Sequence, residues 1–370
     1  MNFPKIMERM RKIRSEISDF EAAERLAKNG IDVFMGHAVF DSPNSVMIGD
    51  RRVTFKKCVV CSGASAYIPP FPGLTTVPYL TNENLFNLTT LPFSMVVLGG
   101  GPIGCEMAQA FARFGTKVTV IDRSDVIMKK EDPDAALLVE ESMKRDNVEF
   151  IHHAAVKGIK LLSDTGEKRV EISIRVKGES KDTEIVAQYV FVATGRRPRV
   201  LNMGLDQAGV KYSENTGIEV NDNMRTSNSN IFAAGDCCSR YQFTHMADWM
   251  ARICIKNSLF YGSDRFSKLI IPWCTFTSPE ISHVGLYDAD LVEKKIPYDT
   301  LIRHFSDNDR ALCESDSVGF IKVHVKKGSD HILGATIVGV SAVCIYMLCV
   351  YYVPYHLYNH VHMYRRVLGI

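Results

Sequence analysis

The sequence predicts an α/β fold built on doubly wound sheets of parallel strands. An apolar run at 93–98 leads into a glycine-rich turn, a helical stretch at 105–113 and a second strand at 117–121. This order of elements is how such a sheet begins. In addition, two apolar strands at 59–64 and 191–196 end in similar glycine turns. The chain is therefore expected to contain two related dinucleotide-binding folds.

Length and composition set the class of protein. A chain of 370 residues is long enough for two or three domains of about 150 residues each. Hydrophobic residues make up 46% and charged residues 23%, which is typical of globular proteins. The 44 basic and 42 acidic side chains give a net charge of +2, too small a field to attract nucleic acid. No nucleic-acid partner is expected.

The cysteines and the first residues indicate the compartment. Ten cysteines are scattered along the chain without the density of a secreted disulfide scaffold, which favours a reducing environment. The segment Met1–Lys5 reaches a charge quickly and has no apolar core, so it is not a signal peptide. A cytoplasmic location is expected, or an organellar one if a targeting segment precedes Met1.

Several other elements follow from periodicity and turn residues. Apolar positions at helical spacing from Met7 to Phe20, with a stop at Asn29-Gly30, predict one amphipathic helix. Short apolar runs over 31–62 predict a β-meander that ends in a buried strand at 57–62. The proline-rich loop at 68–73 is a natural domain joint. Further strands are expected at 159–176 and 183–192.

The glycine-rich turn matches the dinucleotide fingerprint G-x-G-x-x-G in its structural context. Gly99 permits the tight turn, Gly101 lets a pyrophosphate approach the backbone, and Gly104 lets the helix pack closely on the strand. The start of the helix then offers N–H groups to the phosphates. The candidate nucleotide-binding residues of the turn are Gly99, Gly100, Gly101, Pro102, Ile103 and Gly104.

Two carboxylates accompany this turn. Asp122 follows the second strand, where it would accept hydrogen bonds from a ribose hydroxyl and repel a 2′-phosphate, which favours NADH. The adjacent Arg123 could receive that phosphate instead, so NADPH remains an alternative. Glu106 is expected in the first turn of the helix, where the macrodipole stabilises a carboxylate.

A third carboxylate lies further along the chain. A polar turn at 226–230 and a short apolar strand lead to Gly235-Asp236, at an expected junction between strand and helix. Asp236 there could hydrogen-bond sugar-like hydroxyls, or it could simply cap the helix. The sequence leaves both alternatives open.

Four motifs in order give the chain a family resemblance. They are GGGPIGCE at 99–106, ATGRRP at 193–198, TSNSNIFAAGD at 226–236 and PWCTFTSPEISHVG at 272–285. With them the chain resembles the pyridine nucleotide-disulfide oxidoreductases, in their mercuric-reductase-like and dihydrolipoamide-dehydrogenase-like branch. The resemblance covers about residues 1–342.

The resemblance implies a flavoprotein that passes hydride from NAD(P)H to FAD and then electrons to a disulfide or another sulfur-bound acceptor. It also implies two interleaved Rossmann-like FAD- and NAD(P)-binding domains and an α+β interface domain through which two copies dimerise. The implied parts are a first FAD segment at 1–92, an NAD(P) domain at 93–197, a second FAD segment at 198–265, a truncated interface domain at 266–342 and an atypical apolar tail at 343–370.

The resemblance assigns roles to the candidate residues. The fingerprint glycines and Asp122 would hold the nicotinamide nucleotide, and Asp236 the ribityl chain of the flavin, with Gly195 and Gly235 in the cofactor-binding set. Glu106 resembles the glutamate that pairs with a lysine beside the flavin. It is therefore the candidate catalytic residue.

Family motifs are also missing from this sequence. The FAD fingerprint, the C-x-x-x-x-C redox pair and the flavin lysine would lie before Met1, and the closing His-Pro and glutamate would follow Ala342. The expectation is a shortened chain with impaired catalysis and weak or absent flavin binding. The alternative is a non-catalytic NAD(H)-binding remnant, tethered to a membrane by its tail.

The remaining cysteines and histidines do not replace the missing groups. Cys58 and Cys61 are three apart on an expected strand, so they point to opposite faces and are structural. Cys237 and Cys238 are adjacent and are expected to pack in the interior. The spacing of Cys344 and Cys349 is a coincidence within an apolar tail. The tail histidines lack accompanying ligands, so no metal site is expected; they are His356, His360 and His362.

The C-terminal region is the ambiguous part of the sequence. Residues 333–353 are long and apolar enough for a membrane-spanning helix. Gly334, Gly339 and the β-branched run at 336–338 equally predict a buried strand followed by a tail. A membrane association through 333–353 therefore remains an alternative, with the core strand favoured.

Overall fold

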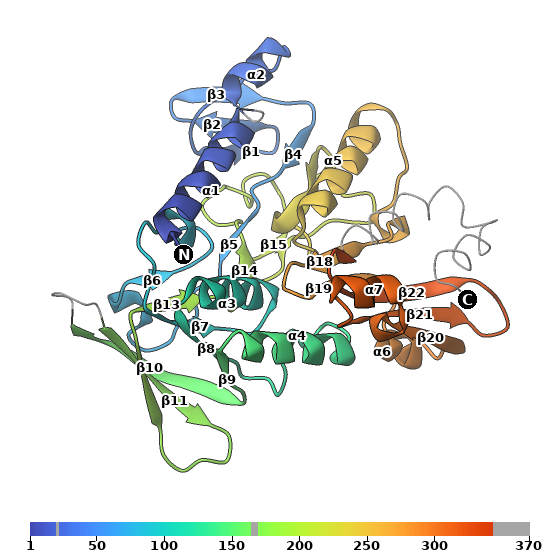
Figure 1. The fold of residues 1–370 in the computed structure, drawn as a ribbon. Helices are drawn as coiled ribbons and strands as arrows, with labels where there is room; N and C mark the ends of the chain where they lie inside the picture. The colour runs from blue at the N-terminus through green and yellow to red at the C-terminus, as the bar shows by residue number, and fades with distance from the viewer. Residues whose placement is uncertain (20–21, 164–168, 343–370) are drawn as a thin grey trace. The chain divides into compact units, whose positions relative to one another are not determined.

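The structure of this chain, a computed structural model, describes residues 1–19, 22–163 and 169–342 (Figure 1). It forms two compact units, each built from three stretches of sequence. The first unit holds residues 1–68, 82–90 and 195–269, and the second holds 69–81, 91–194 and the chain from 270 onward. The finer division into five parts stays a prediction.

The first unit begins with two helices and a three-stranded antiparallel meander. The helices are α1 (Phe3–Ser18) and α2 (Ala23–Lys28). The strands are β1 (Ala38–Ser42), β2 (Ser45–Ile48) and β3 (Arg51–Thr54), paired in chain order. The predicted meander is therefore confirmed over these residues.

The single helix predicted up to Asn29-Gly30 is wrong, because α1 ends at Ser18. The Ser18 hydroxyl donates a hydrogen bond to the carbonyl of Ser15 at 2.8 Å, and such local bonds compete with continuation of a helix. The predicted stop is confirmed for α2. Gly30 has a φ of +79° and donates its N–H to the Ala27 carbonyl, as a left-handed residue after a helix does.

The rest of the first unit surrounds a short pair of parallel strands. β4 (Cys58–Val60) pairs in parallel with β17 (Ile231–Ala233). The buried strand predicted at 57–62 is shorter than expected, since Cys61 is exposed. The other elements are β5 (Ala64–Ala66) paired with β14 (Arg196–Pro198), β15 (Tyr212–Ser213) paired with β16 (Gly217–Ile218), α5 (Thr244–Leu259) and the 3-10 turns η2 (Leu85–Asn87), η3 (Gly235–Cys237) and η4 (Phe266–Lys268).

The second unit is organised around a five-stranded parallel sheet, which confirms the predicted α/β class. All five residues of its central strand β7 (Ser94–Leu98) are buried, as expected for a parallel strand covered on both faces. The helices α3 (Pro102–Phe114) and α4 (Pro133–Arg145) follow β7 and β8 in the chain. The strand order is β6 (Tyr79–Leu80), β13 (Tyr189–Val192), β7, β8 (Lys117–Ile121) and β9 (Val148–Ile151).

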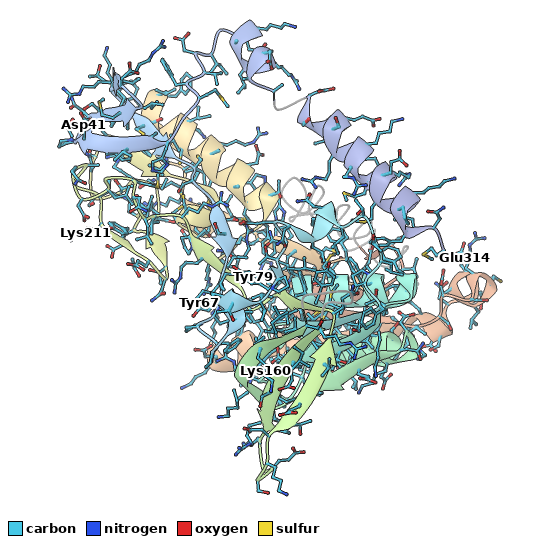
Figure 2. The ribbon with its side chains drawn as sticks, turned by 90° about the vertical axis from the view of Figure 1, so that its left-hand side faces the viewer. Asp41, Tyr67, Tyr79, Lys160, Lys211 and Glu314 are labelled. Atoms are coloured by element: carbon cyan, nitrogen blue, oxygen red, sulfur yellow. The ribbon has the colours of Figure 1, made fainter. Side chains whose placement is uncertain are left out.

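A small antiparallel sheet projects from this unit. It contains β10 (Ala154–Ser163), β11 (Arg169–Val176) and β12 (Thr183–Ala187), where strands were predicted. On its surface Lys160, labelled in Figure 2, pairs with Glu171 at 2.6 Å. The 3-10 turn η1 (Leu74–Thr76) lies against β10.

The C-terminal part of the second unit is a five-stranded antiparallel sheet, drawn in orange and red in Figure 1. Its last strand, β22, accounts for 332–339 and confirms the predicted core strand there. The strand order is β18 (Pro272–Thr275), β19 (Glu280–Gly285), β22 (Ile332–Gly339), β21 (Phe320–Lys326) and β20 (Tyr298–His304), with α6 (Asp288–Glu293), η5 (Phe305–Asp307) and α7 (Asp309–Glu314) between them.

The rest of the possible membrane segment lies outside the described residues, as do Cys344, Cys349 and the tail histidines. Over the described ranges, no helix combines the length and the apolar character needed to cross a bilayer.

A buried ion pair joins the C-terminal sheet to the start of α4. Lys322 of β21 lies 2.7 Å from Asp132 and 2.6 Å from Asp134. Lys322 is 8% and Asp132 3% exposed. Asp132 also caps α4, since it accepts the N–H of Asp134 at 3.0 Å. Burial lowers the pKa of Lys322, but the hydrogen bonds to both aspartates outweigh it and raise that pKa overall.

Replacing Lys322 by methionine is expected to lower the free energy of unfolding by about 3 kcal/mol, because the variant leaves a buried carboxylate without its charge partner. Urea unfolding at pH 7 measures the change. The control is Arg310→Met, which removes an exposed pair with Glu314 and should cost less than about 0.5 kcal/mol. Equal effects of the two substitutions would contradict the structural role of the buried pair.

The stability of the second unit should depend on pH through His283. This side chain is fully buried, and burial lowers its pKa from 6.5 to about 4. The unfolded chain therefore takes up a proton between these values while the folded chain does not, so stability falls as the pH drops from 6.5 to 4. The loss is about 3 kcal/mol on the usual conversion.

Urea midpoints measured across this range should fall less steeply for His283→Gln than for the parent. The exposed His331 provides the control, since His331→Gln should keep the parent slope. A parent slope in His283→Gln would show that other groups carry the pH dependence.

Candidate nucleotide site

The glycine turn after β7 has the geometry that the fingerprint predicts. Gly99 has a φ of +107°, and a Cβ atom on it would lie 2.6 Å from the carbonyl oxygen of Ala193. Only glycine tolerates this combination of a left-handed backbone and a close neighbour. The turn is therefore held against the end of β13 by a contact that no larger residue can make.

Gly104 brings the helix onto the turn. A Cβ on Gly104 would lie 2.0 Å from the carbonyl oxygen of Gly99, closer than any real contact. The absence of a side chain thus sets the distance between α3 and β7, in agreement with the role predicted for the third glycine.

Gly101 differs from both, because it faces open space. It is the N-cap of α3, and a Cβ on it would meet no atom within 4 Å. The next residues of the turn, Pro102 and Ile103, begin the helix, and Ile103 is 37% exposed. Free amides at a helix start beside unfilled space form a cradle for an anion such as a pyrophosphate.

Asp122 lies next to this cradle at the end of β8. Its Oδ2 accepts the N–H of Gly100 at 2.6 Å, and its Oδ1 accepts the N–H of Ser124 at 2.6 Å. Each carboxylate oxygen keeps a second lone pair for a ribose hydroxyl. Asp122 therefore shapes the turn and can still accept a hydrogen bond from a ligand. The neighbouring Arg123 is exposed.

The loop after Asp122 folds back onto the glycine turn, a feature that sequence reasoning missed. The N–H of Met128 donates to the carbonyl of Gly100 at 2.7 Å. Ile127 is fully buried, and its Cγ2 would lie 3.1 Å from a Cβ on Gly100. The apolar pair at 127–128 was the available signal, since two large apolar side chains within a highly charged loop are expected to be buried against a packing partner.

The structure corrects the predicted position of Glu106. Because α3 begins at Pro102 and not at 105, Glu106 lies in the second turn, beyond the reach of the helix start. Its Oε1 accepts the N–H of Phe276 at 2.9 Å. Burial raises the pKa of Glu106, and this hydrogen bond partly opposes the rise. Its catalytic role stays a prediction.

The first unit holds the residues predicted for the flavin. Asp236 lies in η3 and pairs with Arg196 at 2.7 Å, with a side chain 15% exposed. Gly195 and Gly235 have φ values of +126° and +80°. Because α5 begins only at Thr244, the helix-capping alternative for Asp236 is wrong.

Arg196 donates from Nη2 to the carbonyl of Ala64 at 3.1 Å, and the residues on both sides of it are held by Tyr67. The N–H of Tyr67, labelled in Figure 2, donates to the carbonyl of Gly195 at 2.9 Å, and the Arg197 guanidinium lies 4.8 Å from the Tyr67 ring centre. The Nε of Arg196 is buried without a hydrogen-bond partner in the described structure. These residues fit part of a FAD site, although a flavin hydroxyl would have to share Asp236 with Arg196.

The described cysteines are free thiols. Cys237 is buried and Cys238 half-buried, as expected for interior packing. Within the described ranges, no group of three or more histidine, cysteine or acidic residues is arranged to hold a metal ion.

Comparisons with known proteins agree with this geometry. The family model of the pyridine nucleotide-disulphide oxidoreductases matches residues 2–251, and the model of the dimerisation domain of that family matches 271–352. A mercuric reductase of Staphylococcus aureus is 29% identical over 328 residues, which are 89% of this chain and 59% of that protein. A dihydrolipoyl dehydrogenase of Geobacillus stearothermophilus is 32% identical over 86% of this chain and 67% of its own.

Solved structures have the same fold. The Cu(II) complex of the HOCl-induced flavoprotein disulfide reductase RclA from Escherichia coli superposes with a TM-score of 0.85 at 25% identity, over 96% of this chain and 80% of that one. LpdA from Mycobacterium tuberculosis gives 0.84 at 23% identity, over 96% and 78%. This chain spans about half to three-fifths of the mercuric reductases that it matches. It belongs to the pyridine nucleotide-disulphide oxidoreductase family.

Proposed function

We propose that the chain is an NAD(P)H-dependent, FAD-linked oxidoreductase of the mercuric-reductase-like kind. The observation that carries the proposal is the anion cradle at the start of α3, where Gly101 faces open space between Gly99 and Gly104. Members of the family use FAD and NAD(P)H. The open space at Gly101 supports the nucleotide-binding part of that proposal.

NADH is the favoured nucleotide in this proposal. Asp122 sits at the end of β8 beside the turn, where its negative charge repels a 2′-phosphate and its free lone pairs accept from a ribose hydroxyl. Arg123 is exposed next to it, which keeps NADPH as the alternative.

The chain's own residues bind and orient the nucleotide. Amides at the start of α3 hold the pyrophosphate, Asp122 holds the ribose, and Glu106 fixes the backbone at Phe276. FAD, when bound, supplies the centre that accepts the hydride and passes electrons onward. Asp236 would hold its ribityl chain, in competition with Arg196.

The second candidate function is a non-catalytic NAD(H)-binding protein. The Asp236–Arg196 pair favours it, because a flavin hydroxyl would have to share this carboxylate with the arginine. Weak flavin binding and impaired catalysis are therefore part of the proposal. Homodimerisation through 266–342 is a further part, supported by the match of this region to the family's dimerisation domain.

Substitutions in the glycine turn should separate nucleotide binding from folding. Gly101→Ala is expected to leave the melting temperature unchanged, because its Cβ meets no protein atom, and to weaken NADH binding by at least about tenfold, since the methyl group fills the pyrophosphate space. Gly104→Ala should lower both the melting temperature and the affinity for NADH, because its Cβ would collide with the carbonyl oxygen of Gly99. NADH fluorescence titration and thermal unfolding measure the two effects. An unchanged NADH affinity in Gly101→Ala would refute the proposal that the pyrophosphate binds at the start of α3.

Flavin binding separates the two candidate functions, because a flavin-linked oxidoreductase retains some FAD whereas a protein that binds only NAD(H) retains none. After incubation with excess FAD and gel filtration, the protein should retain less than stoichiometric flavin, and NADH-dependent reduction of a small disulfide should be absent. Asp236→Asn should remove the flavin that remains. A stoichiometric flavin absorbance band together with disulfide turnover would contradict the impaired-catalysis proposal and leave the full oxidoreductase.

A further inference from the structure

We propose that Glu131 is a positioning residue for the nucleotide site, through which the C-terminal sheet fixes the loop 123–132 against the glycine turn. The inference rests on the proposed binding of a nicotinamide nucleotide to that turn. It assigns a role to three side chains to which the sequence analysis gave none: Glu131, Trp273 and Tyr287.

Both carboxylate oxygens of Glu131 accept hydrogen bonds from the C-terminal sheet. The indole N–H of Trp273 donates to Oε1 at 3.0 Å and to Oε2 at 3.1 Å, and the Tyr287 hydroxyl donates to Oε2 at 2.6 Å. Burial raises the pKa of Glu131, while the bonds from Tyr287 and Trp273 oppose the rise. A half-buried carboxylate with three donor contacts is strongly held in position, because charge-assisted hydrogen bonds exceed neutral ones in strength.

The two donors are themselves fixed by the sheet that carries them. The Tyr287 ring stacks on His283 with centroids 3.5 Å apart, and the Trp273 ring centre lies 4.8 Å from that of His283. The imidazole of His283 is bonded to the hydroxyl of Thr336 at 2.9 Å and to the carbonyl of Gly285 at 3.1 Å. The two donors to Glu131 are thus connected through His283 of β19 to Thr336 of β22, the central strand of the sheet.

Glu131 is connected to the glycine turn by a short chain of backbone bonds. Its N–H donates to the carbonyl of Met128 at 2.8 Å, and the N–H of Met128 donates to the carbonyl of Gly100 at 2.7 Å. Met128 is 3% exposed and has a φ of +45°, a conformation that a residue of this size holds only when its surroundings impose it. A shift of Glu131 therefore moves the atoms that touch Gly100.

The same loop begins directly after Asp122 and contains Arg123, the two residues proposed to meet the ribose or its 2′-phosphate. Asp122 is bonded to Gly100 and Ser124, so its orientation depends on the path of the chain on both sides. Loosening the loop at Glu131 should therefore weaken nucleotide binding and change the ratio of NADH to NADPH affinity. A side chain that only stabilises the fold would change the melting temperature and leave that ratio unaltered.

The test compares dissociation constants of NADH and NADPH in full-length variants. Glu131→Ala should weaken NADH binding by about tenfold, and Tyr287→Phe and Trp273→Phe each by a few-fold, since each of the last two removes one donor and retains an aromatic ring. Glu131→Gln keeps the shape of the side chain and should weaken NADH binding less than Glu131→Ala does. The control is Glu141→Ala, an exposed acid of α4, which should leave both constants within twofold of the parent.

The outcomes distinguish the two proposals. If the parent protein binds neither nucleotide, the proposed function fails and this inference with it. If the parent binds NADH and the Tyr287→Phe and Trp273→Phe variants, folded as judged by circular dichroism, keep its affinity and its NADH to NADPH ratio, the proposed function stands and the role of Glu131 is refuted.

Discussion

The close approach of α3 to the end of β7 is the constraint on which the nucleotide site depends. The carbonyl oxygen of Gly99 occupies the place where a Cβ on Gly104 would lie, and a Cβ on Gly99 would in turn meet the end of β13. Three elements therefore converge at one point because two residues lack side chains. The amides at the start of α3 are brought to the carboxyl end of the sheet, where open α/β sheets bind ligands.

Local patterns predicted the elements around this point closely and missed contacts made across the chain. The strand at 117–121 is observed with the predicted bounds, because its alternation and flanking turns lie within a few residues. The helix was expected at 105 and begins at Pro102, since proline at the first helical position was not used as a start signal. That offset moved Glu106 from the first turn of the helix to the second. Its pKa is therefore set by burial and by the hydrogen bond from Phe276, and not by the helix macrodipole.

The partners of the site residues were beyond sequence reasoning for a simple reason. Glu131 meets Trp273 and Tyr287 at separations of 142 and 156 residues, and no periodicity within a helix or a strand encodes such a contact. Asp236 was singled out from its motif, but its partner Arg196 lies on β14, 40 residues earlier in the chain by the numbering. The motif at 193–198 contains that arginine, yet a motif does not reveal which carboxylate it neutralises.

Glu131 and Asp132 show how two adjacent acids can serve different purposes in one loop. Asp132 caps α4 and is paired with a buried lysine, an arrangement whose desolvation cost nearly cancels its attraction, so its main effect is to fix geometry. Glu131 is held by neutral donors, which keep a carboxylate in place without a counter-charge. Both acids are bonded to the same C-terminal sheet, one through β21 and the other through β18 and the residue before α6. The loop is thus anchored to the C-terminal sheet at two consecutive residues and to the glycine turn through the bond from Met128 to Gly100, so the sheet and the turn hold its two ends.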